Sequence, residues 1–360
     1  TLSRVGASLV MLLLAKEVAI ALKAGASLSQ PSTPAQAIDP KTAPLVSVVV
    51  PAFNEARAIE ETIRGLVELD YPRLEVVVVD DGSTDDTLAK AKRAAASVSG
   101  VAVRVLTQAN AGKWKALNVG IAHSKGDLIL CVDADSYVHR DALSMMVPHF
   151  DNADVGAVSG QVQVRNQVNL VTRLQALEYL VTNGSARTAQ ADNGCVLIVP
   201  GPLGLFRRSV LEEVSRTYFR EGGTGASEGT GPFSRHTFAE DFELSVMICA
   251  LGHKIHYEPR AVSQTRAPDS IHALLSQRYR WLRGSMQVAS RFRSDAKRVG
   301  NRALRWWMAV STAGELYLIP LAGLSLLGLL AWTAVVGDMK GLVSLWLIVW
   351  AIHACAAAMF

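Results

Sequence analysis

Three stretches decide the fold, and they read LVSVVVPAFNE at 45–55, LEVVVVDDGSTDDT at 74–87 and DLILCVDAD at 127–135. Each contains a short apolar run, and the first two are rich in β-branched residues, which is typical of buried strands. Helical patterns follow the first two runs at 56–69 and 85–98. Strand–helix alternation of this kind predicts an α/β fold with a parallel sheet, whose ligands bind at the carboxyl ends of the strands.

Polar side chains gather at these predicted strand ends. They are Asn54 and Glu55 after the first run, Asp80 and Asp81 after the second, and Asp133 and Asp135 after the last. Carboxylates at neighbouring strand ends repel one another unless a cation lies among them, and aspartate oxygens suit Mg²⁺ or Mn²⁺. The alternative is helix capping, which we favour for Ser83 and Thr84. For Asp133 and Asp135 we favour a metal site, because DAD after a short strand directs both carboxylates to one place.

Composition excludes several classes of protein. Hydrophobic residues make up 50% of the 360 residues and the formal net charge is only +4, so a disordered chain is excluded. The four cysteines have no CxxC or metal-ligand spacing, which excludes a disulfide scaffold and favours buried thiols. Charged residues are 19% of the chain, below the roughly 25% of soluble domains. This deficit is concentrated in a few apolar runs.

Two apolar runs, 316–337 and 341–360, are long enough to be transmembrane helices, for which about 20 residues suffice. A third run at 5–22 contains Lys16 and Glu17, so that it either spans the bilayer or lies at its surface. Basic residues precede the first long run, which is typical of the cytoplasmic side of a membrane and of contact with anionic lipid. We therefore expect a multi-pass protein of the inner (cytoplasmic) membrane.

The expected domain organisation has four parts. Residues 1–44 form an N-terminal apolar segment and a linker, and residues 45–290 form a cytoplasmic α/β domain. Residues 291–315 form a basic interfacial segment with Trp306 and Trp307 at headgroup depth, and residues 316–360 form two transmembrane helices. Because the last run is still apolar where the sequence stops, we expect the chain to continue.

Six motifs occur in a fixed order, namely VVVPAFNE, VVVDDGSTDDT, AGKWKALN, VDAD, AEDFEL and QRYRW. Together they make residues 46–287 resemble the family 2 glycosyltransferases, specifically the membrane-embedded synthases of cellulose, chitin, hyaluronan and poly-N-acetylglucosamine. The segment PGPLGLFR at 200–207 resembles the acceptor segment of hyaluronan synthases. One departure is Ala239, which stands where the TED motif of the family has threonine.

The resemblance implies a GT-A fold, which is a Rossmann-like domain that transfers a sugar from a nucleoside diphosphate, with Mg²⁺ or Mn²⁺ as cofactor. Asp133 and Asp135 match the metal-binding DxD motif of the family. Arg280 would stabilise the charge that develops on the leaving diphosphate together with the metal. The residues that match the nucleotide-sugar site are Phe53, Asn54, Glu55, Asp80, Asp81, Lys113, Asp133, Gln277 and Arg280.

The resemblance also implies a catalytic base and an acceptor site. Asp241 matches the general base, which accepts the proton of the acceptor hydroxyl, and Glu240 is the carboxylate beside it. Trp281 offers a face on which an acceptor sugar can stack. A simpler alternative is that Glu240 and Asp241 cap a helix and that Trp281 anchors at lipid. The matching acceptor segment is Gly201, Pro202, Leu203 and Gly204.

The leading hypothesis is inverting, processive transfer from a UDP-sugar to a growing β-linked polysaccharide, with extrusion through the membrane helices. One alternative is a single-transfer enzyme that makes a polyprenyl-phosphate sugar, although such enzymes normally lack QxxRW. Another is a nucleotide-sugar-binding subunit of a polysaccharide secretion complex. A nicotinamide oxidoreductase is disfavoured because no GxGxxG opens the first helix. The expected partners are the donor, the polysaccharide, the lipid bilayer and accessory secretion subunits, and they do not include nucleic acid.

Overall fold

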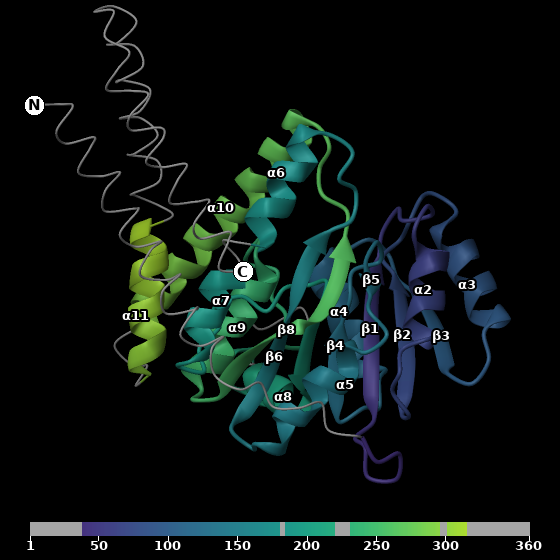
Figure 1. Cartoon of the computed structure of the whole chain (residues 1–360), viewed down its shortest axis with the longest axis horizontal. Helices are drawn as coiled ribbons and strands as arrows, with labels where there is room; N and C mark the ends of the chain where they lie inside the picture. Colours follow the sequence, from purple (N-terminus) through teal and green to yellow (C-terminus); the bar gives the residue numbers. More distant parts are fainter. Residues whose placement is uncertain (1–37, 181–183, 220–230, 296–300, 315–360) are drawn as a thin grey trace, which may run out of the picture.

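The computed structural model describes residues 38–180, 184–219, 231–295 and 301–314. These residues form one sheet of eight strands in the order β3–β2–β1–β4–β7–β6–β8–β5 (Figure 1). The strands are β1 (Val46–Ala52), β2 (Leu74–Asp80), β3 (Ala102–Thr107), β4 (Leu128–Cys131), β5 (Tyr137–Val138), β6 (Val155–Val164), β7 (Gly204–Arg207) and β8 (Lys254–Thr265).

The predicted parallel sheet is confirmed for its first half. β1 pairs in parallel with β2 and β4, and β2 pairs in parallel with β3. In the second half, β7 is antiparallel to β4 and β6, whereas β8 is parallel to β6 and antiparallel to β5. The sheet as a whole is therefore mixed. β7 is only four residues long, so its apolar run is too short to stand out in the sequence.

Helices cover both faces of the sheet because side chains of a strand alternate between its faces. Val48 and Val50 of β1 pack in one cluster with Ile59, whereas Val49 packs in another with Leu117. The helices are α2 (Ile59–Val67), α3 (Thr87–Ser97), α4 (Lys113–Ala122), α5 (Ala142–Met146), α6 (Leu170–Glu178), α7 (Gly184–Ala191), α8 (Arg208–Tyr218), α9 (Glu240–Ala250), α10 (Ile271–Asp295) and α11 (Arg302–Ser311), with a 3₁₀ turn η1 (Val147–Asp151).

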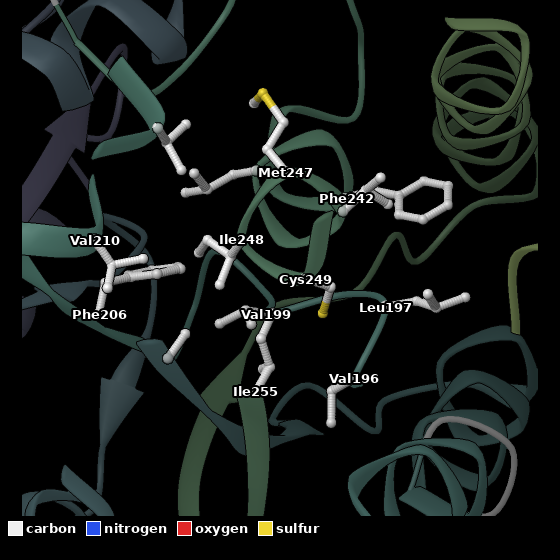
Figure 2. Packing of buried hydrophobic residues seen from close by; sticks show 14 of the residues in the cluster. Val196, Leu197, Val199, Phe206, Val210, Phe242, Met247, Ile248, Cys249 and Ile255 are labelled. Carbon is white, nitrogen blue, oxygen red and sulfur yellow. The ribbon is translucent and has the colours of Figure 1, made fainter. Parts of the chain in front are cut away.

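α9 is almost entirely buried, since every side chain from Phe242 to Cys249 lies in the interior. Figure 2 shows Ile248 of this helix among Phe206 of β7 and Ile255 of β8, and all three belong to one apolar cluster. A helix packed on all sides has little freedom to shift, because protein interiors are close-packed. The burial of α9 therefore fixes the carboxylates at its first residues.

The prediction of a multi-pass membrane protein is contradicted by the described residues. None of their helices is both long and apolar enough to cross a membrane. α10 has the length, with 25 residues, but arginines interrupt its sequence IHALLSQRYRWLRGSMQVASRFRSD. The three runs that the sequence assigns to the membrane, 5–22, 316–337 and 341–360, lie outside the described residues.

The two tryptophans of α11 have different environments. Trp307 is only 5% exposed and packs in the same cluster as α9, whereas Trp306 is 65% exposed. Only Trp306 is thus exposed at the surface, and the predicted headgroup depth of both residues stays a prediction. Adjacent residues of a helix face different directions, and here the direction of Trp307 is toward the core of the domain.

Candidate functional site

The carboxyl ends of β1, β2 and β4 meet side chains from α4 and α9 at one edge of the sheet. Lys113 Nζ lies 2.6 Å from Asp133 Oδ1 and 3.7 Å from Glu240 Oε1. A pocket beside these groups is lined by Lys113, Gly201, Glu240 and Asp241, with apolar walls from Leu117, Phe206 and Phe233. The structure thus brings five of the predicted residues together, although they come from four separate parts of the chain.

Lys113 is the cation of this cluster. It opens α4 directly after Gly112, whose φ of 98° lies in the region that favours glycine. Burial alone would lower the pKa of the Lys113 amine, but the carboxylates of Asp133 and Glu240 outweigh burial and raise that pKa above its ordinary value. The amine therefore stays protonated at neutral pH and offsets part of the negative charge around it.

Asp241 is the second residue of α9 and lines this pocket beside Glu240. Burial, followed by the negative charge of Glu240, raises the pKa of Asp241 to about 6, while Lys113 acts in the opposite direction. Its Oδ1 accepts a hydrogen bond of 2.8 Å from the backbone N–H of Phe242. A carboxylate with this pKa is ionised at neutral pH and still basic enough to take a proton, which are the properties of a general base.

Asp135 lies two residues after Asp133, beyond the end of β4. Its Oδ1 accepts hydrogen bonds from the hydroxyls of Ser136 at 3.4 Å and Thr265 at 3.3 Å. Burial, followed by the charge of Asp133, raises the pKa of Asp135. The described residues contain no group of three or more His, Cys, Asp or Glu side chains placed to hold a metal ion. Two neighbouring carboxylates still fit Mg²⁺ or Mn²⁺, since Mg²⁺ commonly binds through one or two carboxylates and substrate phosphates.

The loop after β1 is tied to the loop after β2. Asn54 has a positive φ of 57°, and its Oδ1 accepts a hydrogen bond of 2.9 Å from the backbone N–H of Thr84. The backbone N–H of Asn54 donates to Ser83 Oγ at 2.9 Å. The prediction that Ser83 and Thr84 cap α3 is therefore wrong: its N-cap is Asp86, which makes no side-chain cap hydrogen bond. Parallel pairing of β1 and β2 places the two loops side by side. The hydroxyls of Ser83 and Thr84 therefore bond to Asn54 instead of capping α3.

Asp81 holds the segment that leads into α4. Its carboxylate is 3% exposed and accepts three hydrogen bonds. The donors are Gln108 Nε2 at 2.6 Å, Ala111 N at 3.0 Å and Gly112 N at 2.8 Å. Asp81 therefore positions Lys113 one residue further on. Asp80 is also buried, and its Oδ1 has no hydrogen-bond partner within the described residues.

Phe53 and Glu55 flank Asn54 and differ in their surroundings. The ring of Phe53 is 46% exposed at the end of β1, where it is available for stacking on a base. Burial, followed by the charges of Asp135 and Asp133, raises the pKa of Glu55 to about 7. Glu55 is thus electrostatically part of the acidic cluster, while Phe53 faces outward.

The predicted acceptor segment divides between pocket and core. A methyl group added at Gly201 would lie 2.7 Å from Lys113 Nζ and 3.1 Å from Asp133 Oδ1, so a larger residue here would have to displace the ends of the two ion-paired side chains. Pro202 is half-buried, but Leu203 is 0% exposed and Gly204 is buried as the first residue of β7. Leu203 and Gly204 are therefore core positions rather than acceptor contacts, because β7 enters the sheet between β4 and β6.

The QRYRW motif lies on α10, beside α6 (Figure 1). Trp281 is 38% exposed, and the guanidinium of Arg278 lies 4.6 Å from the centre of its ring. Arg278 in turn donates hydrogen bonds of 2.8 Å and 2.6 Å to the carboxylate of Glu178. The ring of Tyr179 is 6.4 Å from that of Trp281. One face of the indole is thus occupied by a guanidinium that α6 holds in place.

The other two residues of the motif, Gln277 and Arg280, differ in their exposure. Arg280 is exposed and makes no hydrogen bond or ion pair with any other described residue, so no direct contact joins it to Asp133 or Asp135. Gln277 is partly buried, and its Oε1 has no hydrogen-bond partner among the described residues. Sequence reasoning missed the Arg278–Glu178 pair, because no local pattern links two residues a hundred positions apart.

The mixed sheet, with a parallel half that ends in an acidic edge and a lysine at the start of α4, defines a GT-A-like glycosyltransferase domain. The family model described as "Glycosyltransferase like family 2" matches residues 43–284. The chain belongs to glycosyltransferase family 2. The predicted family and fold are thereby confirmed, whereas embedding in a membrane is not shown.

Two curated relatives have names that bear on the substrate. An N-acetylglucosaminyltransferase from Rhizobium leguminosarum bv. viciae is 33% identical over 259 residues, which cover 71% of this chain and 59% of the relative. A poly-β-1,6-N-acetyl-D-glucosamine synthase from Staphylococcus epidermidis is 28% identical over 247 residues, which cover 68% of this chain and 56% of the relative. The matched part is thus less than two thirds of the length of either relative.

Solved structures share the fold. The mannosyltransferase PcManGT from Pyrobaculum calidifontis, in complex with GDP-Man and Mn²⁺, is 26% identical with a TM-score of 0.69 over 99% of this chain and 98% of that one. Residues 1–349 of TarS from S. aureus, in complex with UDP-GlcNAc, are 19% identical with a TM-score of 0.50, covering 75% of this chain and 73% of that one. The second likeness shows the fold alone.

Proposed function

We propose that this chain transfers a sugar from a UDP-sugar to a hydroxyl group of a growing β-linked polysaccharide, with inversion at the anomeric carbon. The observation that carries the proposal is the pocket in which Asp241 lies beside Glu240 and Lys113, the ion-pair partner of Asp133. The names of the two relatives support N-acetylglucosamine as the sugar. The expected extrusion depends on segments outside the described residues and is not part of the proposal.

Asp241 is the proposed general base. Its carboxylate takes the proton of the acceptor hydroxyl while that oxygen attacks the anomeric carbon and the bond to the diphosphate breaks. A single displacement of this kind converts an α-linked donor into a β-linked product. The pKa of about 6 keeps most of the carboxylate ionised at neutral pH, so that it is ready to accept the proton.

The donor side is built around Asp133 and Asp135. These two residues would hold a Mg²⁺ or Mn²⁺ ion, which when bound supplies positive charge for the leaving diphosphate. Lys113 orients Asp133 through its 2.6 Å ion pair. Phe53 offers its exposed ring to the base of the nucleotide. The Mn²⁺ and nucleotide sugar in the solved mannosyltransferase support a metal-dependent donor site of this kind.

Product sizing with radiolabelled donors tests the proposal. The full chain is incubated with UDP-GlcNAc, UDP-glucose or GDP-mannose and Mn²⁺, and the products are separated by length. A long polymer is the expected result. A single sugar on a lipid would favour the polyprenyl-phosphate alternative. Donor binding without any product would favour the binding subunit of a secretion complex.

A second candidate function is transfer of mannose from GDP-mannose. It is favoured by the likeness to the mannosyltransferase, which extends over 99% of this chain. The same donor panel separates the two, because a base-specific pocket binds one of the two nucleotides more tightly. Incorporation from GDP-mannose alone would replace the UDP-sugar in the proposal.

Trp281 tests whether transfer is processive. Since Arg278 covers one face of the indole at 4.6 Å, the other face is the one on which an acceptor sugar would stack. We expect Trp281→Ala to shorten the polymer while leaving affinity for the donor unchanged, as measured by product length and nucleotide titration. Trp306→Ala is the matched control, because Trp306 is 65% exposed on α11. Polymer of normal length from Trp281→Ala would remove Trp281 from the acceptor site.

A further inference from the structure

A second pocket has Asp135 in its wall, and neither Lys113 nor Asp241 lines it. Its walls come from α2 and the segment before it, from the DAD turn and β5, and from the residues that follow β6 and β8. Three guanidinium groups and two carboxylates share this small concavity, together with a tyrosine. The residues are Arg57, Glu61, Asp135, Tyr137, Arg165 and Arg266.

The charges of this pocket are not balanced within it. Arg165 already has partners within the pocket. Its guanidinium pairs with Glu61 Oε1 at 2.6 Å and lies 5.9 Å from the centre of the Tyr137 ring. Arg57 and Arg266 are exposed, and neither makes a hydrogen bond or an ion pair with another described residue. The three guanidinium groups outnumber the two carboxylates, so the pocket carries a net positive charge.

We propose that Arg57 and Arg266 bind the diphosphate of the nucleotide-sugar donor, an inference that rests on the proposed function. Asp135 forms a wall of this pocket and is also one of the two residues assigned to the metal ion. An anion held here therefore lies next to that ion, and the diphosphate is the anion that the proposed reaction brings there. A guanidinium presents two parallel N–H groups to a phosphate, which gives binding that an amine cannot match.

The assignment adds two guanidinium groups to the one that the sequence predicts for the diphosphate. Arg280, the predicted one, does not line this pocket. Arg57 and Arg266 already share a pocket wall with Asp135 before any ligand binds. Both guanidinium groups are therefore free to donate hydrogen bonds to a phosphate at this wall.

Calorimetric titration of the full chain tests this inference. The ligands are inorganic pyrophosphate, UDP and uridine, each in the presence of Mg²⁺. We expect Arg57→Gln and Arg266→Gln each to weaken binding of pyrophosphate and UDP by about tenfold or more, since hydrogen bonds to charged groups are among the strong ones. Uridine lacks phosphates, so its binding should not change. Arg64→Gln is the matched control, an exposed arginine of α2 outside the pocket.

The outcomes separate the inference from the proposed function. Wild-type affinity for pyrophosphate and UDP in both variants would overturn the inference and leave the function intact. If the arginines are needed for pyrophosphate but the wild type binds no nucleotide, the anion site is supported and the proposed function fails. Far-UV circular dichroism checks folding. Arg266→Lys provides a second variant, which keeps the charge but loses the paired N–H groups and should bind pyrophosphate with an intermediate affinity.

Discussion

Asp241 combines the position and the basicity that the proposed reaction requires of its general base. It lies in the pocket with Lys113 and Glu240, and its pKa of about 6 results first from burial. Asp241→Asn keeps the shape of the side chain but removes its basicity. We expect transfer to fall by about 10²–10⁴-fold while nucleotide binding stays unchanged, which is the range for general-base catalysis. Rate measurements paired with UDP titration check this, and near-normal turnover would assign the base elsewhere.

The same pKa predicts how the rate depends on pH. Because the pKa of Asp241 is raised, the carboxyl is protonated below about pH 6 and cannot accept a proton there, so the rate should fall as the pH drops through this value. Glu240→Gln removes a negative charge that raises this pKa, so the acidic limb should move to lower pH. The exposed Glu212 supplies the control variant Glu212→Gln. A limb that stays in place in Glu240→Gln would contradict the assignment.

Contact between two helices sets the position of the QRYRW motif. Gly284 of α10 packs so closely against the start of α9 that an added methyl group would lie 2.6 Å from Ala239 Cβ and 2.7 Å from Ala239 N. The hydroxyl of Thr237 accepts a hydrogen bond of 3.0 Å from the Ala239 N–H. A larger side chain at 239 would meet α10, which gives a physical reason for alanine at this place. α10 is thereby held directly against the helix that carries Asp241.

Gly284→Ala tests this contact. The added methyl must push α10 away from α9, and overpacking typically costs about 1–3 kcal/mol of unfolding free energy. Urea denaturation of both forms measures the loss. Gly65→Ala in α2 is the control, since its nearest side-chain atoms are 3.4 Å away and alanine favours helix there. Equal stability of Gly284→Ala and wild type would show that the two helices can move apart freely.

At the scale of the whole molecule, the two halves of the sheet meet at the DAD turn. Asp133 is bound to Lys113 of α4 in the parallel half, whereas Asp135 accepts a hydrogen bond from Thr265 of β8 in the mixed half. A metal ion on both carboxylates would therefore bridge these halves. We expect a strong chelator to abolish transfer, and Asp135→Asn to do the same without unfolding the chain. Asp151→Asn, at an exposed aspartate of η1, is the control. Full turnover in the chelator would rule out the metal.

The sequence by itself was sufficient to predict the parallel strands and the polar residues at their carboxyl ends. Apolar runs such as 45–52 specify strands locally, and parallel pairing then brings all their carboxyl ends to one edge. Lys113, Asp133 and Asp241 could be assigned by motif because each stands in a short, fixed pattern. Lys113 and Asp241 line one pocket, and Asp133 is joined to it through its ion pair with Lys113.

The other features of the fold and the site were decided only by the tertiary structure, because they depend on how segments distant in the sequence pack together. Leu203 belongs to the core since β7 enters the sheet between β4 and β6, and no local pattern encodes that insertion. Arg278 pairs with Glu178 only when α10 lies beside α6, and Arg57 lines one pocket with Arg266 only when the end of β8 reaches the start of α2. Such contacts join residues a hundred or more positions apart. The energies of these contacts arise from packing and charge in the folded chain, so a pattern in the amino-acid sequence does not predict them.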